Sequence, residues 1–283
     1  KSHNVAKDLK PTDGALGRLA ASFTDGQDMI ILPDDPDSIE PLCDYIMTRV
    51  RLKKIDVRTL DQSVRSILAL KEKLGLPSAH FNNDDVMSGI GVREYGQTSR
   101  DIISQSITLL RNDGGIVPFD SRGRFVLFVN FSDSLSTKEL TRFSVETVKD
   151  RPELKMINVL NASDPRLLRE VMRRTREADF VVCTLFFAPS PTGFESGLTH
   201  EQLSLISRIA GANRRTACIS FVGPQPILDI TTVPAFLACY GLTTDYTDSA
   251  LDALFGHASI TGKLPFNLSE RFPSGYGIVS PAR

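Results

Sequence analysis

The sequence lacks the features that mark several large classes of protein. No apolar run approaches the roughly 20 residues that a helix needs to span a bilayer. The 33 basic and 34 acidic side chains nearly cancel, so no broad electrostatic field attracts nucleic acid or an anionic membrane surface. We therefore expect neither nucleic acid nor a membrane among the partners of this protein.

The motifs of common cofactor and nucleophile sites are also missing. The four histidines are scattered, with no H-E-x-x-H pair and no Cys/His cluster, so no metal site is predicted. No G-x-x-x-x-G-K-[ST] loop is present, and no G-x-G-x-x-G follows the first strand of the α/β section. The G-x-S-x-G elbow of the α/β hydrolases is absent as well. We expect no cofactor.

The four cysteines, Cys43, Cys183, Cys218 and Cys239, show no C-x-x-C spacing. Three of them lie in apolar runs that read as buried strands, where a thiol usually acts as a small hydrophobic group. We expect reduced cysteines and a cytoplasmic location, with the periplasm or secretion as alternatives. Residues 1–3 (KSH) are neither an initiator methionine nor a signal peptide, so we expect a processed chain or part of a longer polypeptide.

The 283 residues are 41% hydrophobic and 24% charged, which is typical of a globular protein with a sizeable core. Residues 28–32 (DMIIL) read as a buried parallel strand. Apolar residues at helical spacing predict one helix from Pro36 to about Val50 and a second from about residue 56 to a stop at Gly75. Residues 77–93 are polar and aperiodic, and form the best linker.

The rest of the chain alternates between apolar runs and helix-competent segments. A third helix is expected to run past Ile103 and Leu110, ending before Asn112. Five buried strands are predicted at 125–131, 155–160, 180–187, 216–222 and 235–240, with helices at 135–149, 165–177, 199–213 and 247–256. This order predicts an α/β fold, a mostly parallel sheet sandwiched by helices. Residues 264–268 (LPFNL) are a further candidate for an edge strand, which could be antiparallel.

Two acidic positions lie where ligands gather in such folds, beyond the carboxyl ends of strands. Glu195 sits in a Gly/Pro-rich loop after the third predicted strand of the sheet, where a carboxylate could act as a general acid or hold a sugar hydroxyl. Alternatively, it is a solvated residue or helps to order the entry to a helix capped by Thr199. Asp34 and Asp35 follow the first predicted strand, as substrate-binding candidates in a barrel mouth or simply as the cap of the next helix.

The order of several short motifs resembles the C-terminal portion of glycoside hydrolase family 3. The matching segments span nearly the whole chain, and they are 25–37 (DGQDMIILPDDPD), 53–76 (KKIDVRTLDQSVRSILALKEKLGL), 106–119 (SITLLRNDGGIVPF), 253–268 (ALFGHASITGKLPFNL) and 273–278 (PSGYGI). Each segment is weak alone, whereas the ordered set is specific. The character is nearest to the two-domain bacterial β-N-acetylglucosaminidases of the family, with its β-glucosidases next.

The resemblance implies a domain plan. Residues 1–76 would be the C-terminal end of a (β/α)8 barrel, the TIM-barrel fold, with residues 77–93 as linker. Residues 94–283 would form the α/β sandwich domain of the family. The partners would be a carbohydrate substrate and the remainder of the barrel, in the same polypeptide or a second chain. Without that remainder, apolar side chains such as Ile39, Ile46 and Val50 would lack cover.

The resemblance also implies a chemistry, hydrolysis of terminal β-linked sugars by a retaining glycosidase. The family nucleophile is an Asp on a strand that would precede Lys1, so this chain alone would lack it. In the β-glucosidases the acid/base is a Glu in roughly the place of Glu195, although residues 193–202 (GFESGLTHEQ) depart from that loop's usual charged pattern. In the glucosaminidases this domain holds no acid/base. A non-catalytic carbohydrate-binding or scaffold module is the competing function.

Overall fold

A computed structural model describes residues 26–29, 36–76, 90–132, 137–148, 153–160, 162–187 and 197–283. The chain divides into two compact units, Lys1–Ile90 and Gly91–Arg283. Most of the strand predicted at 28–32 lies outside the described residues.

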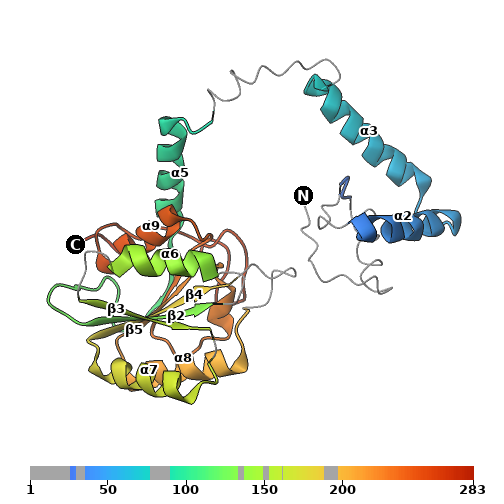
Figure 1. Cartoon of the computed structure of the whole chain (residues 1–283). Helices are drawn as coiled ribbons and strands as arrows, with labels where there is room; N and C mark the ends of the chain where they lie inside the picture. Colours follow the sequence, from blue (N-terminus) through green and yellow to red (C-terminus); the bar gives the residue numbers. More distant parts are fainter. Residues whose placement is uncertain are drawn as a thin grey trace. The chain divides into compact units, whose positions relative to one another are not determined.

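Two helices make up the described part of the first unit. They are α2 (Pro36–Arg51) and α3 (Val57–Lys73) (Figure 1). Asp56 caps α3, because its side-chain oxygen accepts a hydrogen bond from the backbone N–H of Arg58 at 3.0 Å. The helix ends before Gly75, whose φ of 66° is the left-handed conformation that favours glycine. Both helices begin and end close to the predicted residues.

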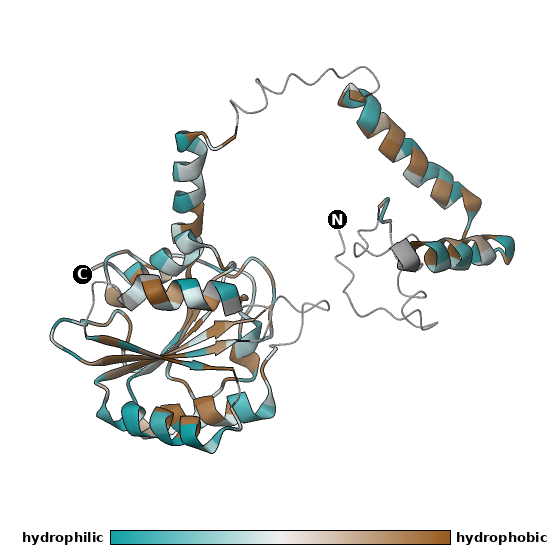
Figure 2. Cartoon of the chain, viewed as in Figure 1, coloured by the Kyte–Doolittle hydropathy of each residue, from teal (hydrophilic) through white to brown (hydrophobic). Residues whose placement is uncertain are grey.

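Large apolar side chains of this unit remain exposed. Leu42 and Ile55 are buried. The exposed apolar side chains are those of Ile39, Met47, Leu52, Val57, Val64, Leu68, Leu70, Leu74 and Leu76. Figure 2 shows apolar positions recurring along α3. Two helices cannot enclose this much apolar surface by themselves.

The second unit is built on one six-stranded sheet with the order β1-β6-β5-β4-β2-β3. Five strands are parallel to their neighbours, and β1 pairs antiparallel with β6 at the edge. The strands are β1 (Thr108–Asn112), β2 (Val126–Ser132), β3 (Leu154–Val159), β4 (Phe180–Phe186), β5 (Thr216–Ser220) and β6 (Ala235–Ala238). All residues of β2 and β4 are buried, which explains why their sequences are continuously apolar rather than alternating.

Helices cover both faces of this sheet (Figure 1). One layer contains α6 (Thr137–Val148) and α9 (Thr244–Phe255), and the other contains α7 (Pro165–Glu177) and α8 (His200–Ala212). Phe143 of α6 packs on one face with Phe128 and Phe186, whereas Ile206 and Val171 belong to the core on the other face. Two further elements complete the unit, namely the helix α5 (Arg93–Ser106) and the short 3₁₀ helix η2 (Gln225–Leu228).

The predicted α/β fold is confirmed, including all five parallel strands between residues 125 and 240. Two expectations about the edges were wrong. The helix predicted to reach Leu110 ends at Ser106, and Thr108–Asn112 becomes β1 because pairing with β6 satisfies its backbone groups. Residues 264–268 form no strand; instead the backbone N–H of Leu264 donates to the carbonyl of Tyr276, and that of Leu268 donates to the carbonyl of Phe272, within the same C-terminal segment.

The open six-stranded sheet is the one sheet within the described residues, so the described chain contains no closed (β/α)8 barrel. None of the described helices combines the length and the apolar character that crossing a bilayer requires. All four cysteines are free, and Cys183, Cys218 and Cys239 are buried as predicted. Burial raises the pKa of the Cys183 thiol to about 12 and also raises the pKa values of the other two buried thiols. These thiols therefore act as apolar packing groups and not as nucleophiles.

Candidate functional site

The direction in which the chain crosses the sheet reverses between β2 and β4. From β2 the chain moves outward to β3 by way of α6, whereas from β4 it moves the other way to β5 by way of α8. These two helices pack on opposite faces, as right-handed crossovers require. The carboxyl ends of β2 and β4 therefore flank a topological switch point, the usual place for a ligand in an open α/β sheet.

Polar side chains, of which Asn130 and Thr184 are buried, tie the strands together two residues before β2 and β4 end. Thr184 of β4 donates to Oδ1 of Asn130 at 2.5 Å, and Nδ2 of Asn130 donates to Oδ1 of Asn158 on β3 at 2.8 Å. Ser144 of α6 donates to the same oxygen of Asn158 at 3.3 Å. At the last residue of β2, the buried hydroxyl of Ser132 has no partner among the described residues. Hydrogen-bonded polar side chains thus lie beneath the switch point, and the hydroxyl of Ser132 can still bind a ligand.

The loop that carries Glu195 leaves the sheet at this place. Glu195 itself lies outside the described residues, but both ends of its loop are defined. The loop begins after Phe187, which directly follows β4, and it ends at Gly197, whose φ is 72°. A Cβ on Gly197 would lie 3.4 Å from that of Phe187, so the two anchors pack closely.

A capping box fixes the end of the loop nearest α8. Thr199 accepts a hydrogen bond from the backbone N–H of Gln202 at 3.2 Å, and the Gln202 side chain accepts one from the backbone N–H of Thr199 at 2.9 Å. This confirms the predicted cap at Thr199. The predicted substrate-binding residues Asp34 and Asp35 lie outside the described residues, so the structure places neither of them with respect to the switch point.

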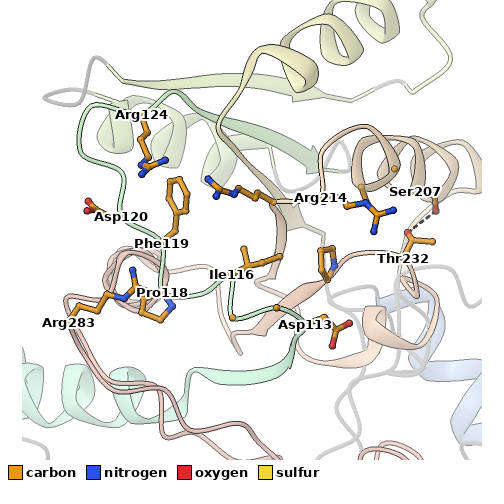
Figure 3. A pocket seen from close by; sticks show the side chains of 16 residues that line it. Asp113, Ile116, Pro118, Phe119, Asp120, Arg124, Ser207, Arg214, Thr232 and Arg283 are labelled. Carbon is orange, nitrogen blue, oxygen red and sulfur yellow. Dashed lines mark hydrogen bonds between the residues drawn. The ribbon is translucent and has the colours of Figure 1, made fainter.

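A hollow lies at the opposite end of the same sheet, the end at which the parallel strands begin. Its volume is about 830 Å³, and it is formed by the β1–β2 connection, the end of α8, the start of β6 and Arg283 (Figure 3). Four arginines line it, namely Arg124, Arg214, Arg215 and Arg283. Sequence reasoning missed this cavity; the adjacent pair 214–215 was the one local signal of concentrated charge.

The two carboxylates of this cavity are unequal. Asp120 accepts hydrogen bonds from the Arg122 guanidinium at 2.9 Å, and this contact lowers the pKa of Asp120 to about 2, with a smaller contribution from Arg124. Asp113 lies at the other side of the hollow and has no ion pair within the described residues. Positive charge therefore exceeds negative charge along the lining.

A buried arginine fixes one wall of the cavity from behind. Arg111 of β1 donates from one guanidinium nitrogen to the carbonyls of Ile230 and Val233, at 3.0 and 2.9 Å. Burial lowers the pKa of Arg111, although the side chain of an arginine stays charged at any ordinary pH. Its two hydrogen bonds order the loop that presents Thr232 and Pro234 to the cavity.

Among the described residues, no group of three or more His, Cys, Asp or Glu side chains could hold a metal ion. The chemistry that the described chain offers is therefore of two kinds. The carboxyl ends of β2 and β4 present the polar side chains of Asn130, Thr184 and Ser132, and the end of the sheet where the parallel strands begin presents an arginine-lined hollow.

Comparison with protein families gives one match over most of the second unit. The family model described as the glycosyl hydrolase family 3 C-terminal domain matches residues 107–274, which is more than half of the chain. No curated protein sequence matches.

Solved structures share the fold at low sequence identity. A β-N-acetylglucosaminidase of glycoside hydrolase family 3 from Paenibacillus sp. str. FPU-7 superposes with a TM-score of 0.59 and 20% identity, covering 90% of this chain and 48% of that one. A β-glucoside phosphorylase gives 0.58 and 18%, covering 89% and 46%. A β-glucosidase from Listeria innocua, in complex with gluconolactone, gives 0.58 and 17%, covering 91% and 37%. The chain thus spans less than half the length of each.

Proposed function

The chain belongs to glycosyl hydrolase family 3. On that premise we propose that it is the C-terminal portion of a retaining β-glycosidase whose favoured substrates are terminal β-N-acetylglucosaminides. The observation that carries the proposal is the family match over 107–274 together with a glutamate loop that leaves the sheet at its switch point. Hydrolysis with retention needs a nucleophilic carboxylate and an acid/base, about 5–5.5 Å apart when both are carboxyls. We assign at most one of these two groups to this chain.

The remaining parts of the proposal follow from the domain plan. Residues 1–76 complete a (β/α)8 barrel whose remainder carries the nucleophile, residues 77–93 link the two domains, and residues 94–283 form the sandwich domain. The exposed apolar face of α3 supports this plan, because the rest of a barrel would cover it. Asp34 and Asp35 then belong to the substrate-binding mouth of the barrel. The four free cysteines support a reducing, cytoplasmic location.

Two enzyme mechanisms differ in what Glu195 does. If the parent protein works as a β-glucosidase, the carboxyl of Glu195 protonates the leaving oxygen. If it works as a β-N-acetylglucosaminidase, the acid/base lies in the barrel and Glu195 contacts substrate or solvent. We favour the second mechanism, because residues 193–202 (GFESGLTHEQ) fit the charged β-glucosidase loop poorly.

The experiment compares leaving groups in the parent protein that includes the whole barrel. Rates are measured for Glu195→Gln with an activated aryl β-N-acetylglucosaminide and with a poor alkyl leaving group, and then with the matching β-glucosides. A lost general acid costs about 10²- to 10⁴-fold on a poor leaving group, and much less on an activated one. We expect small and equal losses, below about tenfold for both. A selective loss on the poor leaving group would instead assign Glu195 as the acid.

Glu201→Gln is the matched control. Glu201 is an exposed carboxylate in the first turn of α8, six residues beyond Glu195 and outside the loop. It should leave both rates unchanged. The 283-residue chain alone should hydrolyse neither sugar, because it lacks the proposed nucleophile. A parent protein that binds but does not hydrolyse either sugar would contradict the proposal and favour a non-catalytic carbohydrate-binding or scaffold module.

A further inference from the structure

The arginine-lined cavity at the amino edge has no role in the proposed glycosidase. It lies where β2, β5 and β6 begin, whereas the Glu195 loop leaves from the carboxyl end of β4. The two sites therefore occupy opposite edges of one sheet. A ligand in the cavity would not meet a sugar at the switch point.

None of the four arginines of the cavity forms an ion pair within the described chain, and Arg124 acts on Asp120 only as a neighbouring charge. Asp120, a carboxylate of the cavity lining whose pKa Arg124 also lowers, already accepts two hydrogen bonds from the Arg122 side chain. Guanidinium groups present forked donors that match the oxygens of a phosphate. The cavity thus offers donors for an anion that the described residues do not supply.

Other residues of the lining could bind the uncharged, hydroxyl-bearing part of a small molecule. Ser207 and Thr232 form a hydroxyl pair, with Oγ1 of Thr232 donating at 3.3 Å (Figure 3). Each hydroxyl keeps further capacity to accept or donate. Ile116 and Pro118 add an apolar wall on the other side. Pairing hydroxyls with an apolar wall is the usual composition of a site for a small polar molecule.

Charge and size narrow the ligand class. Asp113 and Asp120 also line the cavity and would repel a molecule with negative charge along its whole length, such as a nucleic acid or an acidic peptide. One compact anionic group, held away from those carboxylates, avoids that repulsion. The volume of about 830 Å³ lies within the roughly 300–1,000 Å³ of small-molecule pockets.

We propose that this cavity is a binding site for a phosphorylated monosaccharide, with Arg124 and Arg214 on the phosphate and the Ser207–Thr232 pair on the sugar hydroxyls. The site is independent of the catalytic assignment, because it uses no residue of the switch point. A ligand at this edge would stabilise the sandwich domain by binding only its folded state.

The test is calorimetric titration of the full-length protein with glucose 6-phosphate at low ionic strength, with glucose and inorganic phosphate as separate arms. We expect glucose 6-phosphate to bind more tightly than either. The double variant Arg124→Gln/Arg214→Gln should weaken binding by about tenfold or more, since hydrogen bonds to charged groups are lost. Arg208→Gln is the matched control: Arg208 is an exposed arginine on α8 that does not line the cavity, and its variant should bind as the parent does.

The outcomes separate clearly. Absence of binding, equal binding of glucose, or equal binding of inorganic phosphate would each overturn the assignment. So would equal affinities in the double variant and the Arg208→Gln control. A measurement on the unmodified protein adds an independent criterion, because affinity must fall as salt screens the guanidinium–phosphate attraction. Affinity that does not change with ionic strength would also overturn it. Hydrolytic activity is not a readout here, so failure of the glycosidase proposal would not affect the result.

Discussion

The two units of the chain differ in how they treat the same kind of side chain. Leu205 of α8 is 1% exposed against the sheet of the second unit, whereas Leu68 of α3 in the first unit is 57% exposed. Both residues lie on amphipathic helices of similar length. The helix α8 has a sheet beneath it, and in the described part of the first unit α3 has no sheet to cover. An apolar stripe on a helix predicts burial, but the stripe is buried only where another element, such as a sheet, packs against it.

This difference indicates which unit contributes most to the free energy of unfolding of the chain. Burial of a leucine or phenylalanine side chain contributes about 1.5–3 kcal/mol, and the second unit buries many of them on both faces of its sheet. The described helices of the first unit leave several large apolar side chains exposed. The second unit should therefore unfold as a cooperative block, whereas the stability of the first would, under the proposed domain plan, depend on the remainder of the barrel.

The largest expected effect compares one substitution in the two units. Leu205→Ala should lower the free energy of unfolding by about 2–5 kcal/mol, because it leaves a cavity in a closed core. Leu68→Ala in the 283-residue chain should change it by less than about 0.5 kcal/mol, as for other exposed positions. Urea unfolding followed by circular dichroism measures both.

The same pair of variants sharpens the comparison in the parent protein. If the remainder of a barrel covers α3, Leu68→Ala should become clearly destabilising there, whereas Leu205→Ala should keep its effect. Equal costs for the two variants in the 283-residue chain would contradict the contrast between the units. An unchanged, negligible cost of Leu68→Ala in the parent would argue against the proposed cover.

An intermediate effect is expected at the helix caps. Thr199→Ala removes one half of the capping box of α8 and should cost about 1 kcal/mol in the unfolding of the second unit. Asp56→Ala removes the cap of α3, and it should fray that helix without changing the unfolding of the second unit. Hydrogen exchange resolved by residue distinguishes local fraying from global destabilisation. Faster exchange in the sheet on Asp56→Ala would show that the units are coupled.

The smallest effect concerns acid sensitivity on the surface of the second unit. The Arg122 guanidinium lowers the pKa of Asp120 to about 2 in the folded state, below its ordinary value. The contribution of this pair is therefore present above the unfolded pKa and is lost as the pH falls towards about 2. Asp120→Asn should remove that part of the acid dependence, and only slightly, because both side chains are solvent-exposed. Titration of the Asp120 carboxyl by nuclear magnetic resonance tests it directly; an ordinary pKa would contradict the pairing.

Much of the fold could be predicted because it is encoded locally. The helix predicted at 165–177 is α7, Pro165–Glu177, where Asp164 caps the first turn and proline follows it. The continuous apolar runs became buried parallel strands, as their lack of alternation indicated. Thr108–Asn112 was misread because a short apolar run fits helix or strand equally well, and pairing with Ala235–Ala238 decides between them.

The candidate sites were less accessible to sequence reasoning. Glu195 could be proposed as a candidate because it stands alone in a Gly/Pro-rich loop after an apolar run, and the cap at Thr199 could be predicted because caps have a local signature. The arginine-lined cavity has no such local signature in the sequence. Arg124, Arg214 and Thr232 come from three separate connections, and only the strand order brings those connections to one edge.

The sequence by itself determined which segments are helix or buried strand and how the helices begin, because caps, apolar periodicity and β-branched runs act over a few residues. Tertiary structure alone decided that Thr108–Asn112 would close the sheet as an antiparallel edge and that β2 and β4 would flank the switch point. It also decided that four arginines from separate parts of the second unit would converge at the opposite end of the sheet. Those outcomes depend on hydrogen bonds and packing between residues far apart in the chain, and no local pattern records them.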